Sequence, residues 1–246
     1  MCYSAMVEQS RSKLERIFEA KSDEQVFDAF RGVQALEQSM SPQEVRSVLG
    51  LARAPKVSQF RWAPDQPDAR VYPGYFAPVI IWREQGRTLV PMRYRVRPAG
   101  SAKEIPSKYN VFNCRIDSLQ SRQTWRRLFG QTHALFPFIR FFEWVEDEKG
   151  NKVQLSYAPE DREIMWAPAL YDTWSSPDGQ VAFNSFAILT DEPPPEVAAT
   201  GHDRCPIFLR SDLIDAWLQP ENKSKSQLLD LLRQREVTFF EHARAA

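Results

Sequence analysis

The middle of this chain is a succession of short runs rich in β-branched and aromatic residues, while helical patterns occur mainly toward its two ends. Runs that favour strands cover residues 79–82, 88–90, 134–145, 164–174, 182–190, 206–209 and 237–240. Apolar residues recur at helical spacing within residues 10–50, 121–129, 212–218 and 226–235. This segregation predicts an α+β fold in a single domain spanning residues 1–246, and it disfavours alternating β-α units around a parallel sheet.

Local signals refine this prediction in the first half of the chain. Ser22 with Gln25 forms a weak capping box, and Ser41 followed by Pro42 predicts an N-cap and the first position of a helix. Residues 93–110 are basic and then polar, so they predict an extended surface loop.

Charge and composition limit the classes of partner. The 246 residues include 32 basic and 32 acidic ones, so the chain does not resemble a protein that coats DNA through bulk charge. A local basic groove is still open, because 23 of the basic residues are arginine, which suits bidentate phosphate contacts. Five arginines lie close together in the sequence: Arg83, Arg87, Arg93, Arg95 and Arg97.

Several common enzyme classes lack their motifs in this sequence. There is no Gly-x-Gly, no Walker phosphate loop, no HExxH helix and no GxSxG elbow. Three cysteines and three widely spaced histidines favour neither a disulfide framework nor a zinc site, so we expect no metal or other cofactor. No apolar run approaches a membrane span and no signal peptide is evident, which predicts a soluble protein of a reducing compartment without a membrane partner.

Cys2 stands directly after Met1, and a residue this small permits removal of the methionine. The product would be an N-terminal cysteine whose α-amine, with a pKa of about 8, is partly neutral at pH 7. Such an amine can attack an aldehyde to give a Schiff base, and the thiol can then close a five-membered thiazolidine. The position therefore indicates aldehyde capture or acyl transfer. The alternative is an incidental buried thiol.

Glu143 is the one carboxylate in the aromatic run Phe141-Phe142-Glu143-Trp144. On a strand it would share a face with Phe141 and point away from Phe142 and Trp144. A carboxyl group in apolar surroundings suits a general acid. The alternative is a glutamate on the solvated face of a half-buried strand.

Two further segments could contribute chemistry. His202 is the only histidine in a turn-like, charged context, where it could shuttle a proton or simply be a hydrogen-bonded structural residue. Asn113 could orient a substrate oxygen, and Arg115 could bind a phosphate. Alternatively, Asn113 caps or turns the chain and Arg115 pairs with Asp117 on the surface.

Taken in order, these segments resemble the SRAP (SOS response-associated peptidase) family. That family has an N-terminal Met-Cys, an Asn-x-Arg-x-Glu segment, a Gly-Phe-Tyr-Glu-Trp-like segment and a His-x-Arg-Met-Pro segment. The corresponding stretches here are residues 1–5, 113–117, 140–144 and 202–206. Residues 91–94, 169–174 and 186–190 resemble three further family segments, so the resemblance covers nearly the whole chain.

Some positions depart from the family pattern. Tyr3-Ser4 replaces the usual Gly-Arg, so an arginine near Cys2 is lost. Asp117, Arg140 and Cys205 replace glutamate, glycine and methionine, and residues 94–110 diverge strongly from the usual continuation.

The resemblance implies a mostly antiparallel, barrel-like β core with peripheral helices that binds single-stranded DNA at abasic sites. The ring-opened sugar aldehyde would react with the amine and thiol of Cys2, forming a thiazolidine crosslink that shields the lesion in the SOS response. Glu143 would be the general acid/base, His202 would move protons, and Asn113 would hold Cys2 or the sugar. The candidate phosphate contacts are Arg93, Arg115 and Arg204, with aromatic side chains stacking on bases.

Two other functions stay open at this point. In a thiol peptidase, one that removes its own Met1, Cys2, His202 and Glu143 would form a nucleophile, base and orienting group. A non-covalent module would bind single-stranded DNA with or without a lesion. If the chain captures abasic sites, we expect a monomeric, cytoplasmic, nucleoid-associated protein, with proteins of the replication fork as candidate partners.

Overall fold

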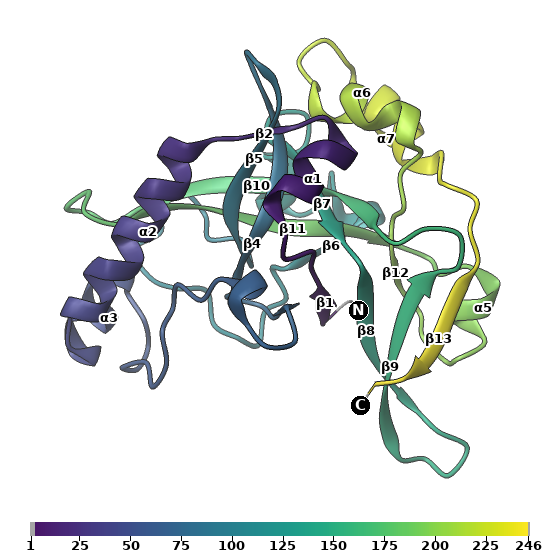
Figure 1. Ribbon diagram of the computed structural model, residues 1–246, viewed down its shortest axis with the longest axis horizontal. Coiled ribbons are helices and arrows are strands. Elements are labelled where there is room, and N and C mark those ends of the chain that lie inside the picture. Colours follow the sequence, from purple (N-terminus) through teal and green to yellow (C-terminus); the bar gives the residue numbers. More distant parts are fainter. Residues whose placement is uncertain (1–2, 246) are drawn as a thin grey trace.

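A computed structural model describes residues 3–245, and its strands form two sheets (Figure 1). The larger sheet has the order β12-β11-β10-β7-β4-β5-β2, with β6 paired to β11. Its strands are β2 (Lys21–Ser22), β4 (Phe76–Arg83), β5 (Gly86–Tyr94), β6 (Asn113–Arg115), β7 (His133–Phe138), β10 (Met165–Ser175), β11 (Ala182–Asp191) and β12 (Cys205–Pro206). The smaller sheet has the order β13-β9-β8-β1-β3, formed by β1 (Ser4–Met6), β3 (Arg70–Val71), β8 (Arg140–Glu146), β9 (Lys152–Pro159) and β13 (Phe240–Arg244).

Five strands of the larger sheet close into a barrel. β4 pairs with β5 and β7, and β10 pairs with β7 and β11, all antiparallel. The ring closes where β5 and β11 run in parallel, with Arg93 opposite Ser185 and Tyr94 opposite Phe186. Tyr94, Phe136 and Phe186 are fully buried and their rings pack together. The α+β class that the sequence pattern predicts and the barrel-like core that the family resemblance implies are therefore both confirmed.

The helices lie around the barrel (Figure 1). They are α1 (Arg11–Phe18), α2 (Glu24–Ser39), α3 (Pro42–Leu49), α4 (Gln123–Arg126), α5 (Pro195–Ala198), α6 (Ile214–Leu218) and α7 (Lys225–Arg233), with 3-10 turns at Ala63–Asp65, Ile116–Ser118 and Ser211–Leu213. α2 and α3 pack over a second apolar cluster formed by Phe30, Val45, Leu49, Phe60, Phe76, Trp174 and Val181. Within residues 3–245, no helix combines the length and apolar character needed to cross a membrane.

The predicted helix caps have different outcomes. The N-cap predicted at Ser41, with Pro42 beginning the helix, is confirmed for α3. Glu44 completes a capping box there: its N–H donates to Ser41 Oγ, and the Ser41 N–H donates to Glu44 Oε2 at 2.7 Å. The box predicted at Ser22 is wrong, because Ser22 ends β2 and Asp23 caps α2 by accepting the Val26 N–H at 3.1 Å. A carboxylate at this position also interacts favourably with the helix dipole.

The surface loop predicted for residues 93–110 is wrong in its first part. Arg93 and Tyr94 still belong to β5, and the Arg93 and Arg97 side chains are buried. The charge of these arginines is offset by Glu104, whose carboxylate lies 2.8 Å from Arg93, 3.2 Å from Arg95 and 3.6 Å from Arg97. We call Arg93, Arg95, Arg97 and Glu104 the arginine cluster. A single carboxylate thus lets a basic segment pack against the barrel.

Two of the strand boundaries also differ from the sequence prediction. The run at residues 134–145 forms two strands, β7 and β8, which belong to different sheets. The chain turns at Ile139, whose N–H donates to the Met6 carbonyl at 2.7 Å. The last strand begins at Phe240, where the predicted run ends, because the run at 237–240 is mostly exposed and only Phe240 is buried.

His133 at the start of β7 makes stability depend on pH. Its Nε2 accepts the Gly130 N–H at 2.9 Å, so the ring proton lies on Nδ1, which donates to the Trp217 carbonyl at 2.8 Å. Burial lowers the pKa of His133 from its ordinary value to about 3. The unfolded chain then binds a proton that the folded protein excludes, so this contribution is present above pH 6.5 and is lost as the pH falls toward 3.

We expect His133 to lower the free energy of unfolding by about 2 to 3 kcal/mol when the pH falls from 7.5 to 4.5. Urea unfolding of wild type and His133→Gln at both pH values isolates it, because the carboxylates that titrate in this range are common to both proteins. His242→Gln, at an exposed histidine of β13, is the matched control. Equal pH dependence of wild type and His133→Gln would contradict the assignment.

Candidate active site

Three of the four residues predicted to carry chemistry lie in the described part of the chain, and all three are buried. Asn113 begins β6, Glu143 lies in β8, and His202 precedes β12. These residues are 6%, 2% and 9% exposed, respectively. Cys2, the fourth, lies outside the described residues. Ser4, two residues further along the chain, begins β1 and pairs with Phe142, the residue before Glu143.

The alternation of β8 explains why Glu143 is buried. Phe141, Glu143 and Val145 share the covered face of the strand, whereas Trp144 is 52% exposed and Glu146 is also exposed. The sharing of a face between Glu143 and Phe141 is therefore confirmed. A single-residue shift in the register of β8 would exchange the two faces and move this carboxyl group into solvent.

Glu143 contacts His202 directly. The Nε2 atom of His202 lies 3.1 Å from Glu143 Oε2, although the two residues come from different parts of the fold. The other ring nitrogen, Nδ1, lies 2.8 Å from the Arg204 carbonyl and 3.1 Å from the Arg204 N–H. Either tautomer of the ring thus has a partner at Nδ1, an arrangement suited to a proton that moves between the imidazole and the carboxyl group.

Both the side chain and the backbone of Asn113 are hydrogen-bonded. The Tyr94 hydroxyl donates to Asn113 Oδ1 at 3.0 Å, which fixes the orientation of the side-chain amide. The backbone N–H of Asn113 donates to Asn110 Oδ1, also at 3.0 Å. Because Tyr94 is fully buried between aromatic rings inside the barrel, the amide of Asn113 has a rigid support.

The register of β11 brings the Asn113 and His202 segments to one end of that strand. Ile188 pairs with Asn113, and Thr190 pairs with both Arg115 on β6 and Pro206 on β12. His202 lies just before β12 in the chain. Residues far apart in the sequence are thus gathered where β11 ends, while contact with Glu143 joins this end to the smaller sheet.

The three arginines proposed as phosphate contacts lie in different environments. Arg115 is exposed and pairs with Asp117, donating from Nε to Oδ1 at 3.0 Å. The Arg204 side chain is largely covered and donates to the Asp203 carbonyl at 2.9 Å. Arg93 belongs to the arginine cluster. Their contacts with DNA stay predictions, and for Arg93 such a contact requires release from Glu104.

The other two cysteines are poor nucleophiles. Cys114 and Cys205 are buried, and burial raises the pKa of each thiol. Thiolates are the reactive form, so neither side chain competes with Cys2 for an electrophile. Within residues 3–245 no three His, Cys, Asp or Glu side chains are grouped so that they could hold a metal ion.

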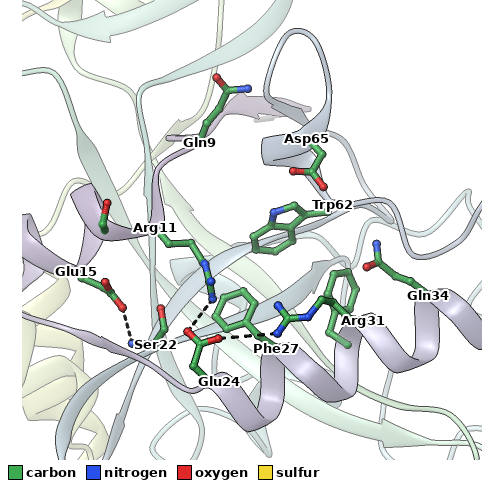
Figure 2. Close-up of a pocket in the computed structure, with 12 residues that line it drawn as sticks. Gln9, Arg11, Glu15, Ser22, Glu24, Phe27, Arg31, Gln34, Trp62 and Asp65 are labelled. Carbon is green, nitrogen blue, oxygen red and sulfur yellow. Dashed lines mark hydrogen bonds and ion pairs between the residues drawn. The ribbon is translucent and has the colours of Figure 1, made fainter.

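A separate pocket of about 580 Å³ lies between the start of α1, α2 and the Ala63–Asp65 turn (Figure 2). Phe27 and Trp62 pack edge to face beside it. Its two arginines, Arg11 and Arg31, both interact with Glu24. None of Asn113, Glu143 and His202 lines this pocket, so it is distinct from the candidate site.

Sequence reasoning missed three residues around the site. Tyr94 stands in a segment that resembles the family, but its hydroxyl contact with Asn113 crosses between two strands. Ser4 and Arg70 were passed over, yet Arg70 Nε donates to Ser4 Oγ at 2.9 Å and both residues are buried. The only available signal for Ser4 was its departure from the family pattern.

Comparison with known proteins identifies a family and several relatives. Residues 1–244 match the family model "SOS response associated peptidase (SRAP)". The abasic site processing protein YoqW of Bacillus subtilis is 25% identical over 191 residues, which are 75% of this chain and 84% of that protein. The abasic site processing protein YoaM of the same organism is 26% identical over 167 residues, 68% of this chain and 72% of that protein.

Solved structures share the fold. A protein from Bacteroides thetaiotaomicron has a TM-score of 0.69 at 16% identity, covering 100% of this chain and 92% of its own. A protein from Bordetella bronchiseptica has a TM-score of 0.68 at 15% identity, with both chains fully covered. Since the family model spans nearly the whole sequence, the chain belongs to the SOS response associated peptidase (SRAP) family.

Proposed function

We propose that this protein recognises abasic sites in single-stranded DNA and captures their aldehyde covalently through Cys2, after Met1 has been removed. The observation that carries the proposal is the buried pair of Glu143 and His202. Glu143 lies on β8, which pairs with β1, and β1 begins two positions after Cys2. The names of the relatives support the substrate, because several of them are abasic site processing proteins. Removal of Met1 comes first, and self-processing by the Cys2 thiol is the route that the family name suggests.

The proposed chemistry joins one cysteine to one aldehyde with loss of one water. The abasic sugar opens when its C1′ hydroxyl loses a proton and its ring oxygen gains one. The α-amine of Cys2 adds to C1′ to give a carbinolamine, which loses water to form an imine. The thiol adds to the imine carbon, and its proton goes to the nitrogen. The product is a thiazolidine ring made of the sulfur, C1′, the nitrogen and two cysteine carbons.

Three of these steps need a proton carrier, and the pair of Glu143 and His202 supports that role. A carboxyl group can protonate the ring oxygen as the sugar opens and the carbinolamine hydroxyl as water leaves. Glu143 is buried, so bulk water does not supply these protons, whereas His202 at 3.1 Å can return one to it. Asn113, oriented by Tyr94, would hold the sugar or the cysteine during these transfers.

Intact mass spectrometry tests the proposal. Wild-type protein incubated with a single-stranded oligonucleotide that carries one abasic site should gain the mass of the oligonucleotide less one water, measured from protein that lacks Met1. An oligonucleotide with a tetrahydrofuran in place of the abasic sugar has no aldehyde and should give no adduct. No stable adduct from wild type shown to lack Met1 would overturn the proposal.

Cys2→Ala separates the roles of the amine and the thiol. This variant keeps the α-amine, so we expect an imine that borohydride can trap, but no adduct that survives denaturation without reduction. A thiol peptidase that does not capture aldehydes would give neither product. A non-covalent module would bind intact and abasic strands equally, and Cys2→Ala would not change its affinity.

A further inference from the structure

Arg70 is a buried cation beside the first strand. It begins β3, is only 9% exposed, and lies across β1, where its Nε donates to Ser4 Oγ at 2.9 Å. Its Cζ atom lies 3.6 Å from the centroid of the Phe142 ring and 5.1 Å from that of Tyr72. These contacts fix the plane of the guanidinium against β8.

The charge of Arg70 has no counterpart among residues 3–245. No carboxylate there lies within 4 Å of its guanidinium, and its Nη2 is buried with no hydrogen-bond partner. Buried charges in proteins are normally paired, because an unpaired one has lost its hydration without compensation. The arginine cluster, where Glu104 offsets three arginines, shows how this chain satisfies buried cations elsewhere. A buried guanidinium that lacks a carboxylate partner is suited to binding an anionic ligand.

The position of Arg70 links it to the candidate site. Phe142, on which it stacks, is the residue before Glu143, and Ser4, to which it donates, is two residues after Cys2. Ser4 also stands where the family commonly has an arginine, and its small side chain leaves space that the Arg70 side chain reaches from β3. Tyr72 contacts both Arg70 and the 46% exposed Tyr3, so this group of side chains extends to the surface.

We propose that Arg70 binds a backbone phosphate adjacent to the abasic sugar, and so positions C1′ for attack by Cys2. The guanidinium fork matches two oxygens of a phosphodiester, and such charge-assisted contacts are strong where water is excluded. The proposal rests on the proposed function, because the phosphate belongs to the captured strand. It assigns a phosphate subsite to a residue that lies 68 positions from the nucleophile in the sequence.

Pairing a residue change with a phosphate change tests the subsite. Abasic oligonucleotides are made with a single uncharged methylphosphonate on the 5′ or the 3′ side of the lesion, and the rate of adduct formation is measured below saturation. For wild type, we expect one of the two substitutions to slow capture about 10- to 100-fold, the range of a hydrogen bond to a charged group. Arg70→Gln should be slowed by a similar factor on the natural strand, and by no further factor on that methylphosphonate strand.

Controls separate phosphate binding from a purely structural role. Free 2-deoxyribose carries the aldehyde but no phosphate, so wild type and Arg70→Gln should form its adduct at equal rates. Arg162→Gln removes another arginine that stacks on aromatic rings, Trp166 and Phe208, and should respond to the methylphosphonates as wild type does. If Arg70→Gln does not fold, the exchange Ser4→Arg with Arg70→Ser returns a guanidinium from β1 and should restore sensitivity to the same phosphate.

Two results would overturn the inference without touching the proposed function. The first is that neither methylphosphonate slows adduct formation by wild type. The second is that Arg70→Gln slows adduct formation by the same factor, relative to wild type, on the natural strand and on the methylphosphonate strand. If wild type forms no adduct at all, the proposed function has failed instead. The dissociation constants of the same oligonucleotides, measured by fluorescence anisotropy, then test the subsite in the same way.

Discussion

Glu143→Gln should slow formation of the covalent adduct by about 100- to 10,000-fold, the usual effect of removing a general acid/base. The change keeps the shape of the side chain and an oxygen that can accept from His202, but it removes the group that gains and loses the proton. Binding should be spared, so affinity for a strand with a tetrahydrofuran at the lesion position should change by less than about threefold if the loss is confined to chemistry. Single-turnover rates and fluorescence anisotropy measure the two quantities.

The matched control lies on the same strand. Glu146→Gln changes an exposed glutamate of β8 and should capture the abasic strand at the wild-type rate. The pH profile gives a further readout, because loss of a proton-carrying group should remove one limb of the dependence seen with wild type. Capture by Glu143→Gln at the wild-type rate would exclude Glu143 as the acid/base and leave it a structural role.

Glu104→Ala should lower the free energy of unfolding by about 3 to 5 kcal/mol, the cost of leaving buried charges without their partner. The side chains of Arg93, Arg95 and Arg97 are 9%, 11% and 1% exposed, so water cannot replace the carboxylate. Because these cations are partly desolvated even with Glu104 present, burial lowers the pKa of Arg95, and that of Arg97 to about 10. Urea unfolding measures the loss.

Two variants define the cause of this loss. Glu104→Gln keeps the size of the side chain but not its charge, so it should lose most of the same stability. Asp230→Ala breaks the exposed pair with Arg233, whose side chains are 58% and 70% exposed, and should cost less than about 1 kcal/mol. Because the arginine cluster is shielded from solvent, 1 M salt should not remove the difference between wild type and Glu104→Ala. A loss below 1 kcal/mol in both Glu104 variants would contradict the assignment.

The sequence predicts most of the strands because local patterns decide them. Residues 79–82 and 182–190 are dense in β formers and lie in β4 and β11, and the similar run at 164–174 lies in β10 except for its first residue. β9 is missing from the sequence prediction, although Val153, Leu155 and Tyr157 alternate with polar residues as in a half-buried strand. Its pairing with β8 and β13 shows that this alternation does mark a strand. Parallel closure of β5 on β11 likewise depends on contacts between distant segments, which no local pattern encodes.

The candidate site divides in the same way. Glu143 and His202 were predicted from their local context and family resemblance, and the structure brings them into contact. Three other contacts join separate segments of the chain, and side-chain geometry decides them. They are the hydrogen bond from Tyr94 to Asn113, the ion pairs of Glu104 with three arginines, and the hydrogen bond from Arg70 to Ser4. Nothing in the residue types alone predicts which carboxylate meets which guanidinium.

The parallel pairing of β5 with β11 has a consequence for how the chain acquires its structure during synthesis. β5 ends at Tyr94 and β11 begins at Ala182, so the ring of strands stays open until almost three quarters of the protein has left the ribosome. Long-range pairings of this kind fold slowly because the loop entropy is lost before the contacts form. β6, which carries Asn113, depends on β11 for its partner. A nascent chain that has not yet reached β11 therefore has an unpaired sheet edge to protect, and its Asn113 still lacks the strand that holds it in the candidate site.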